Sequence, residues 1–406
     1  MQLHATMKKS SVARLLAAAL ASALLLAGCG GSGGDGAPAT PPSARFGASS
    51  MFAGVCTLDG QKQFTRAYLD EVYLWYNEIP EVDASRFNNI PDYFNALLVK
   101  TPDVNGLPRD RFSTVLPVAT AQNLLGQTSA PPAGAAANSL LASSSNAVPV
   151  ARVQTTGAGR KVGYIQLNDF DAGAQDALIT AFRQVRDGGA QDLVLDLRFN
   201  SGGFLYIAQA AASMVVGPSA VGKVFEQLTY NDKRPAETAA GTLRFENTVQ
   251  TAESQYPRGT ALPQLDLPRL YVLTTGQTCS SSESIINSLR GIDVQVILVG
   301  TTTCGKPYGF RRKDNCGWAY FPIEFQGTNA KGFGNYTTGF TPTCTVQDNT
   351  GVSAGSEQDP LLNAALHYVD SGTCPVGTAN VQQSTVPSLA AEQPRRPSWA
   401  GRLLLP

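Results

Sequence analysis

Short apolar runs alternate with helically spaced apolar residues along the middle of the chain. The runs are typical of buried strands and the spaced segments of helices packed on a core. They predict strands over 161–167, 193–197 and 294–299, and helices over 174–186 and 204–216. Because strands that alternate with helices favour a mostly parallel sheet with covered faces, we predict an α/β fold that binds ligands at the carboxyl ends of its strands.

Helical patterns also flank this central region. Apolar residues recur every three or four positions between residues 61 and 77, and Asn89 with Pro91 marks the start of a second helix. Asp359 and Pro360 favour the start of a last helix that runs to about residue 369. Residues 223–266 lack a clear repeat and are expected to form an excursion from the sheet.

The beginning of the chain has the pattern of an exported lipoprotein. Residues 1–28 hold a basic start followed by an apolar run too short for an ordinary membrane span. The run ends in Leu-Ala-Gly-Cys, which matches the bacterial lipobox and predicts lipidation of Cys29. Gly30 follows that cysteine, as in lipoproteins of the Gram-negative outer membrane, so we expect the protein on the periplasmic side of that membrane. Residues 30–48 are rich in Gly, Pro and Ser and predict a flexible tether.

Composition narrows the class of function. The chain has 406 residues, 31 basic and 31 acidic, with 43% apolar content, so it can bury a core and offers no electrostatic case for nucleic acid. Its two histidines are His4, within the predicted signal, and His367. A histidine-based metal centre is therefore disfavoured, and a Ser-His-Asp triad would depend on His367 alone. No cofactor is expected.

A serine cluster and a lysine stand on either side of the strand predicted over 294–299. Ser280 begins the cluster at the start of a helical pattern, where free backbone N–H groups favour an anion. Lys306 follows the strand, next to a glycine, a proline and aromatic residues. A serine and a lysine so placed suit a Ser-Lys dyad, if burial lowers the lysine pKa by roughly three units. The alternative is an ordinary lysine in a turn.

Three motifs resemble the tail-specific, or C-terminal processing, peptidase family. They are TCSSSESI, then ILVGTTTCGKPYGF, and upstream of both LDLRFNSGG. The resemblance implies a crotonase/ClpP-like strand-helix repeat core behind a small N-terminal helical domain. It further implies a serine-type peptidase that acts on polypeptides without a cofactor.

The family motifs assign roles to single residues. Matching Glu283 to the motif glutamate makes Ser280 the nucleophile, with Ser281 as the fallback, and Lys306 the base. The backbone N–H groups of Ser281 and of Gly202 or Gly203 would form the oxyanion hole. Without the resemblance, the two glycines are equally consistent with a tight turn after a strand. In the same motif, Asp196 and Arg198 are expected to be a structural ion pair.

The sequence departs from the family in two places. Relatives often carry a polar residue four positions after the lysine, where this chain has Phe310, so Glu283 or Asp314 is expected to support the lysine instead. Relatives also carry a peptide-binding PDZ domain, whereas residues 113–158 are short and partly of low complexity. These departures leave open an inactive lipoprotein that binds polypeptides or serves as an envelope scaffold. A hydratase-like or acyl-transfer enzyme is a third reading, without a coenzyme signature.

Cysteine usage fits an oxidising compartment. Apart from Cys29, six cysteines remain, and six allow fifteen pairings. We expect Cys304–Cys316, which would brace the lysine loop, and Cys344–Cys374, while Cys279 could be free. The whole sequence is thus divided into a signal peptide (1–28), a linker (29–48), a helical domain (49–112), a linker or PDZ remnant (113–158), a catalytic domain (159–374) and a disordered tail (375–406).

Overall fold

The fold centres on a six-stranded sheet. The structure is a computed structural model and describes residues 46–124 and 147–376. The strand order is β13-β8-β7-β4-β3-β2, and every pairing is parallel except that of β2 with β3. The mostly parallel sheet that the sequence predicts is confirmed. The strands are β2 (Val150–Thr155), β3 (Lys161–Gln166), β4 (Asp192–Asp196), β7 (Arg269–Thr274), β8 (Gln295–Gly300) and β13 (Cys344–Thr345).

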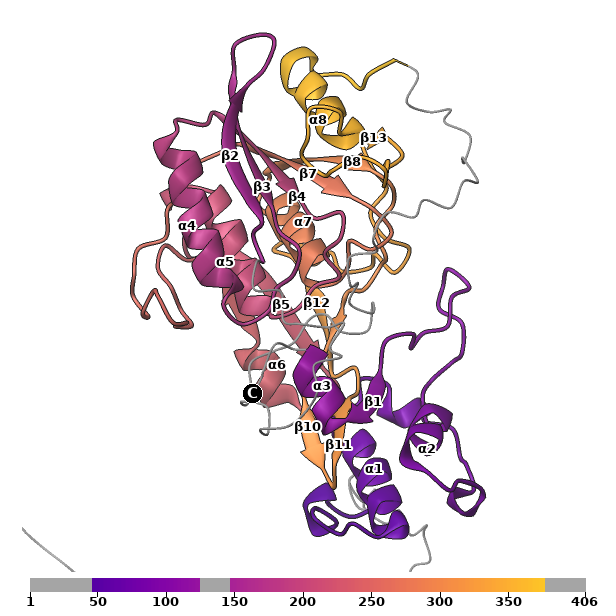
Figure 1. Cartoon of the computed structure of the whole chain (residues 1–406). Coiled ribbons are helices and arrows are strands. Elements are labelled where there is room, and N and C mark those ends of the chain that lie inside the picture. The colour runs from indigo at the N-terminus through magenta and orange to yellow at the C-terminus, as the bar shows by residue number, and fades with distance from the viewer. Residues whose placement is uncertain (1–45, 125–146, 377–406) are drawn as a thin grey trace, which may run out of the picture. The chain divides into compact units, whose positions relative to one another are not determined.

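Helices cover both faces of this sheet (Figure 1). On β4, Leu193 and Leu195 pack into the core beneath α4, α5 and α7, whereas Val194 between them packs beneath α8. Because β4 is buried on both faces, its sequence is continuously apolar rather than alternating. The helices are α4 (Ala174–Asp187), α5 (Leu205–Val215), α7 (Ser281–Gly291) and α8 (Pro360–Ser371). Helices α4, α5 and α8 match the predicted ones within a few residues, and α7 begins at the serine cluster as predicted.

Two smaller antiparallel sheets complete the described part of the chain. One has the order β6-β5-β12-β9 and contains most of the regular structure of the predicted excursion, while the other has the order β1-β11-β10. Their strands are β1 (Thr114–Pro117), β5 (Val224–Tyr230), β6 (Thr242–Arg244), β9 (Tyr308–Gly309), β10 (Lys313–Asn315), β11 (Trp318–Phe321) and β12 (Phe325–Thr328). Strand β9 begins two residues after Lys306, so the four-stranded sheet carries the lysine loop.

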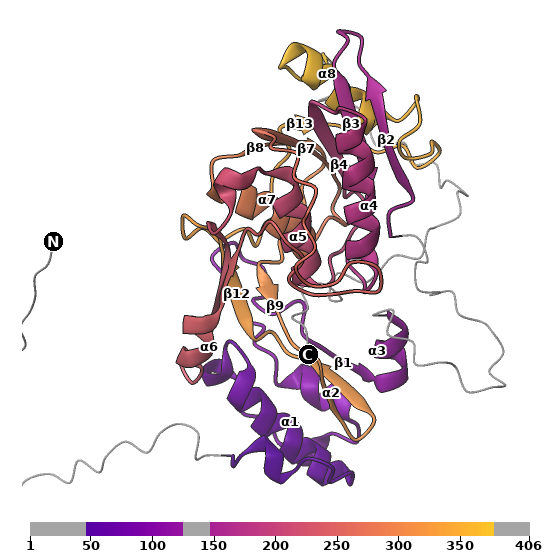
Figure 2. The same ribbon diagram turned by 90° about the vertical axis from the view of Figure 1, so that its left-hand side faces the viewer.

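The N-terminal helical domain packs on these strands rather than standing apart. Side chains of α1 (Leu58–Val72) and α2 (Ile90–Ala96) share one core cluster with Tyr308, Tyr320 and Ile323. Near the end of α1, Asp70 forms an ion pair with Lys233, which precedes α6 (Pro235–Ala240). Figure 2 shows α6 next to α1. The remaining elements are α3 (Val118–Leu124) and four 3₁₀ turns at Ser49–Met51, Tyr76–Glu78, Ala84–Arg86 and Pro218–Ala220.

Helix α1 ends earlier than its apolar spacing predicts. The pattern continues to residue 77, but the backbone turns extended at Tyr73. The Tyr73 hydroxyl donates a hydrogen bond of 2.6 Å to Asp110 and accepts one from the N–H of Val99. A buried hydroxyl needs such partners, and they lie outside the path of the helix.

Several predictions fall wholly or partly on residues outside the described ranges. The signal peptide, Cys29, nearly all of the linker and nearly all of the tail are among them, and so is 125–146 of the stretch expected to be a PDZ remnant. The described ends of that stretch supply β1 with α3 and, at the edge of the large sheet, β2. Across 46–124 and 147–376, none of the helices combines the length and the apolar character needed to span a bilayer.

Candidate active site

Ser280 occupies a strained position at the start of α7. Its backbone has φ 60° and ψ −112°, a region that costs a residue with a side chain about 1–3 kcal/mol. The residue is fully buried, and within the described ranges its Oγ is among the buried polar atoms without a hydrogen-bond partner. A strained, unsatisfied hydroxyl at a helix N-terminus is typical of a reactive position rather than of a packing one.

The turn after β4 lies directly against this serine cluster. The Asn200 carbonyl accepts hydrogen bonds from the N–H of Cys279 at 3.1 Å and from Ser282 Oγ at 3.0 Å. Ser281 Oγ donates to the Gly203 carbonyl at 2.8 Å. Gly203 has φ 151°, and a Cβ there would lie 2.4 Å from the Phe170 carbonyl oxygen, so only glycine fits. The sheet thus brings the glycine turn and the serine cluster together.

Glu283 joins the serine cluster to the lysine loop. Its fully buried carboxylate accepts the backbone N–H groups of Ser280 (2.9 Å), Gly305 (2.8 Å) and Lys306 (2.8 Å), and the Thr303 hydroxyl at 2.6 Å. Burial raises the pKa of this carboxyl, while the four hydrogen bonds oppose that rise. These contacts support the backbone on both sides of the site, so Glu283 acts on the position of the lysine through its backbone.

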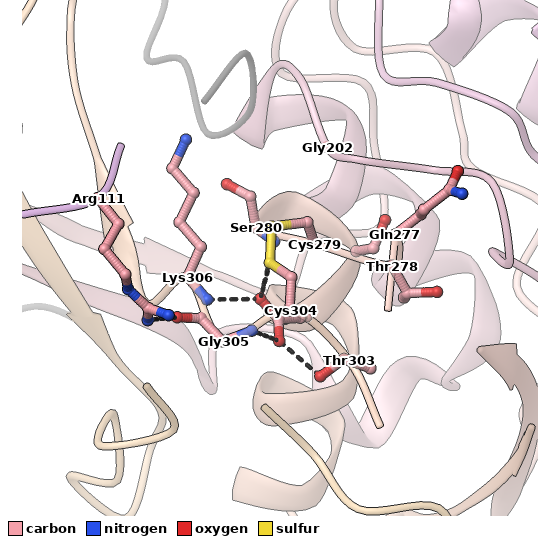
Figure 3. Close-up of a disulfide and its surroundings, with 12 residues drawn as sticks. Arg111, Gly202, Gln277, Thr278, Cys279, Ser280, Thr303, Cys304, Gly305 and Lys306 are labelled. Atoms are coloured by element: carbon pink, nitrogen blue, oxygen red, sulfur yellow. Dashed lines mark hydrogen bonds between the residues drawn. A yellow bond between two sulfur atoms is a disulfide. The ribbon is translucent and has the colours of Figure 1, made fainter. Parts of the chain in front are cut away.

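Lys306 is fully buried, and its backbone N–H shares the Glu283 carboxylate with that of Ser280. Figure 3 shows its amine and the Ser280 hydroxyl extending to the same side of the Cys279–Cys304 disulfide. Burial lowers the Lys306 pKa to about 7, against smaller raising effects of Asp110 and Glu283. The amine lies 4.6 Å from the centre of the Phe310 ring and 5.1 Å from that of Phe112. A neutral amine near pH 7 is what a lysine needs to accept a proton.

The disulfides correct one predicted pairing. Cys304 is bonded to Cys279, not to Cys316, and Cys279 is therefore not free. Cys316 is bonded to Cys56, 260 positions away in sequence, which spacing arguments could not anticipate. The predicted Cys344–Cys374 bond is confirmed. The Cys279–Cys304 bond joins the residue before Ser280 to the loop that carries Lys306.

Three further residues discussed from the sequence are Asp314, Phe310 and His367. Asp314 is exposed on β10 and pairs with Arg312 at 2.7 Å, so the expectation that it supports the lysine is wrong. Phe310 leaves β9 with its ring against the lysine and packs on Phe321, so this position desolvates the amine instead of orienting it through a polar group. His367 is exposed on α8, whereas Ser280 is buried beneath α7's first turn.

Asp196 and Arg198 form the expected ion pair within a larger buried network. Arg198 contacts Asp196 at 2.9 Å, Asp348 at 2.8 Å and Asp359 at 2.5 Å, and the Tyr164 hydroxyl donates to Asp196 at 2.7 Å. Asp359 also caps α8 by accepting the N–H groups of its first turn. The network anchors the carboxyl end of β4, from which the glycine turn departs.

One group of residues has the composition of a metal site. One ligand atom each of Cys279, Glu283 and Cys304 lies within 4.8 Å of the others. Both sulfur atoms are bonded to each other and the carboxylate is occupied by backbone N–H groups. Thiolates are the ligands that such a site requires, so this group does not fit a metal ion.

Sequence reasoning missed the contribution of the helical domain to the lysine site. Asp110 and Phe112 face Lys306, and Arg111 donates to the carbonyls of Thr337 at 2.9 Å and Gly305 at 3.4 Å. The segment belongs to the family-like stretch before the low-complexity region, but no periodicity links it to a lysine 196 positions later. Only the tertiary structure brings it there.

Comparison with known proteins agrees with this arrangement. Residues 161–314 match peptidase family S41, and residues 60–114 match the peptidase S41 N-terminal domain. The chain carries both domains of peptidase family S41. Its S41 domain contains the glycine turn, the serine cluster and the lysine loop, and its S41 N-terminal domain contains the segment that faces the lysine. These family matches support a serine-type peptidase.

Carboxyl-terminal-processing proteases are similar to part of this chain. The protease of Picosynechococcus sp. is 32% identical over 148 residues, which are 36% of this chain and 30% of that protein. The protease of Synechocystis sp. is 28% identical over 148 residues, 36% of this chain and 29% of that protein. The matched segment thus spans under a third of these curated relatives.

The S41 fold is also shared with a solved structure. A putative S41 protease from Bacteroides fragilis superposes with a TM-score of 0.58 at 21% identity, over 76% of this chain and 97% of that one. At this identity the likeness shows the fold alone.

Proposed function

We propose that the protein is a serine endopeptidase that cleaves peptide bonds with a Ser280–Lys306 dyad. The observation that carries the proposal is the burial of Lys306, which brings its pKa to about 7 beside a strained serine hydroxyl. A lysine in water would be charged at neutral pH and could accept no proton. The S41 domains support the same reaction class.

The reaction follows from the two side chains. Ser280 Oγ attacks the carbonyl carbon of the scissile peptide bond as neutral Lys306 takes the hydroxyl proton. The tetrahedral intermediate collapses when the lysine passes that proton to the leaving amine, and an acyl-enzyme forms. Water, deprotonated by the same lysine, then attacks the ester carbonyl. The bond to Ser280 Oγ breaks as the lysine passes the proton to that oxygen, which releases the new carboxyl end and restores the serine.

We assign the oxyanion hole to the backbone N–H groups of Ser281 and Gly203. The Gly202 N–H donates to Asn200 Oδ1 at 2.9 Å, within its own turn, and this engagement favours Gly203 of the two predicted glycines. The Ser281–Gly203 hydrogen bond keeps the two sides of the hole together. Preorganised N–H donors of this kind are each worth roughly 10²–10³ in rate.

We propose envelope polypeptides as substrates and a lipid on Cys29 as the anchor. The lipobox pattern and the pairing of six cysteines support an exported, oxidising location on the periplasmic side of the outer membrane. A lipid would hold the peptidase domain near other envelope proteins. Globomycin treatment of expressing cells tests the anchor, since block of lipoprotein signal cleavage should leave the precursor uncut and Cys29→Ala should abolish lipid labelling.

Fluorophosphonate labelling tests the nucleophile. The wild type is expected to be labelled, and Ser280→Ala to lose labelling entirely, because the probe bonds only to an activated serine. Ser282→Ala is the matched control, since that neighbouring hydroxyl donates to the Asn200 carbonyl and should leave labelling within about threefold. Labelling that survives in Ser280→Ala and disappears in Ser281→Ala would move the nucleophile to the fallback serine. A wild type that stays unlabelled would favour the non-catalytic lipoprotein.

The Cys279–Cys304 bond should matter for labelling, not only for stability. The double variant Cys279→Ala, Cys304→Ala is expected to lower the labelling rate at least about tenfold, because small displacements of reacting groups are costly. The control is the double variant Cys344→Ala, Cys374→Ala. Its bond joins residues 30 positions apart, and the Cys279–Cys304 bond joins residues 25 positions apart, so the two closed loops are similar in length. Both pairs should lose about 3 kcal/mol of stability in urea unfolding. Equal labelling rates in the two double variants would show that the Cys279–Cys304 bond has no particular role in positioning the reacting groups.

A further inference from the structure

We propose that the segment Asp110-Arg111-Phe112 of the helical domain is a positioning segment for the lysine of the dyad. Phe112 shields the amine from water, Asp110 holds the turn that presents Phe112 and supplies a facing negative charge, and Arg111 fastens the segment to the lysine loop. This inference rests on the proposed function and gives a domain outside the catalytic core a part in setting the protonation of the lysine.

The turn is held by one buried carboxylate. Asp110 Oδ1 accepts the N–H groups of Phe112 at 3.0 Å and Ser113 at 2.8 Å, and Oδ2 accepts the Tyr73 hydroxyl at 2.6 Å. The Asp110 side chain is completely buried. Because the carboxylate is occupied on both oxygens, the direction in which residue 112 leaves the turn is fixed.

Phe112 is presented directly to the amine. Its ring centre lies 5.1 Å from Lys306 Nζ and is itself buried, and Phe310 covers the amine at 4.6 Å. Two phenyl rings displace water that would otherwise solvate an ammonium ion. Burial is the largest influence on the Lys306 pKa, and it lowers that pKa.

The segment is fastened to the same loop that carries the lysine. The Arg111 guanidinium donates to the carbonyls of Gly305, next to Lys306, and Thr337. The charged groups that act on the amine are Asp110, from the helical domain, and Glu283, from α7. Both raise its pKa, so the ring of Phe112 and the charge of Asp110 act in opposite directions on the protonation of the lysine.

The test is a titration of Lys306 by NMR. The ¹³Cε signal of the lysine, assigned by its absence in Lys306→Met, is followed with pH in the full chain carrying Phe112→Ala or Asp110→Asn. Phe112→Ala admits water and should raise the midpoint by about one pH unit or more, and Asp110→Asn should lower it by up to about one unit. The matched control is Phe94→Ala, a buried ring of the same domain that packs on Tyr320.

The outcomes separate this inference from the proposed function. Opposite shifts in the two variants, with Phe94→Ala at the wild-type midpoint, support the segment's role. Midpoints unchanged in both variants, or moved the same way in all three, overturn it. Should Phe112→Ala fail to fold, Asp110→Asn still decides, because the amide can keep the backbone acceptor while removing the charge. Since the titration needs no activity, an unlabelled wild type would reject the peptidase and leave this result intact.

Discussion

Lys306→Met is expected to lose serine labelling while gaining stability. Without the amine, nothing identified at the site takes the Ser280 proton, and removal of a general base costs about 10²–10⁴-fold in rate. The methionine side chain fills a similar volume and needs no hydration. Fluorophosphonate labelling and urea unfolding of the same preparations measure both effects.

The gain in stability follows from the lysine pKa. It is about 7 in the folded chain against 10.5 for an ordinary lysine, so between these values the unfolded chain binds a proton that the folded chain lacks. Wild-type stability should therefore rise with pH from about 7 to 10.5. Below pH 7 the full cost, on the order of 4 kcal/mol, opposes folding, and Lys306→Met should be about 2–4 kcal/mol more stable there.

The pH dependence of wild-type labelling tests the same lysine pKa. Labelling should increase as pH rises through about 7, where the amine becomes neutral, and the half-maximum should coincide with the start of the rise in stability. Labelling that is flat between pH 5 and 9 would contradict the lysine as base, and so would a Lys306→Met variant that is labelled like the wild type.

Arg198→Met is expected to destabilise the fold by about 3–5 kcal/mol. The arginine is the cation that faces Asp196, Asp348 and Asp359 in the buried network, so its loss leaves carboxylates without a counter-charge. Because Asp359 caps α8, this helix should loosen from the sheet face that it covers. Because Asp196 ends β4, the glycine turn that follows should loosen as well. Urea unfolding followed by circular dichroism measures the loss.

Arg186→Met is the control for this variant. Arg186 pairs with Asp187 at 2.9 Å, but both side chains are about half exposed or more, at 47% and 65%. Exposed pairs contribute little, so this substitution should change stability by less than about 0.5 kcal/mol. Similar losses of unfolding free energy in the two variants would show that the buried network contributes no more to stability than an exposed ion pair.

Local pattern was sufficient for most of the central elements. The apolar run of β4 predicts that strand to within a residue, and the helical spacing after the serine cluster predicts where α7 begins. A strand buried on both faces and a helix with one buried side leave a direct trace in sequence. The Gly-Lys after β8 and the serine cluster before α7 are likewise local motifs. These two motifs come together because β7 and β8 are neighbouring parallel strands, whose carboxyl ends share one edge of the sheet.

Contacts between distant segments were decided only by the tertiary structure. Cys304 has Cys279 rather than the nearer Cys316 as its partner, because pairing depends on the distance between loops and not on separation along the chain. Likewise, the depressed pKa of Lys306 depends on burial, which includes a ring brought by Phe112 from the helical domain. The sequence by itself determined that a serine and a lysine flank one strand. Only the packing of two domains decided that the lysine would be dry enough to act as a base, since desolvation is a property of the surroundings and not of the residue.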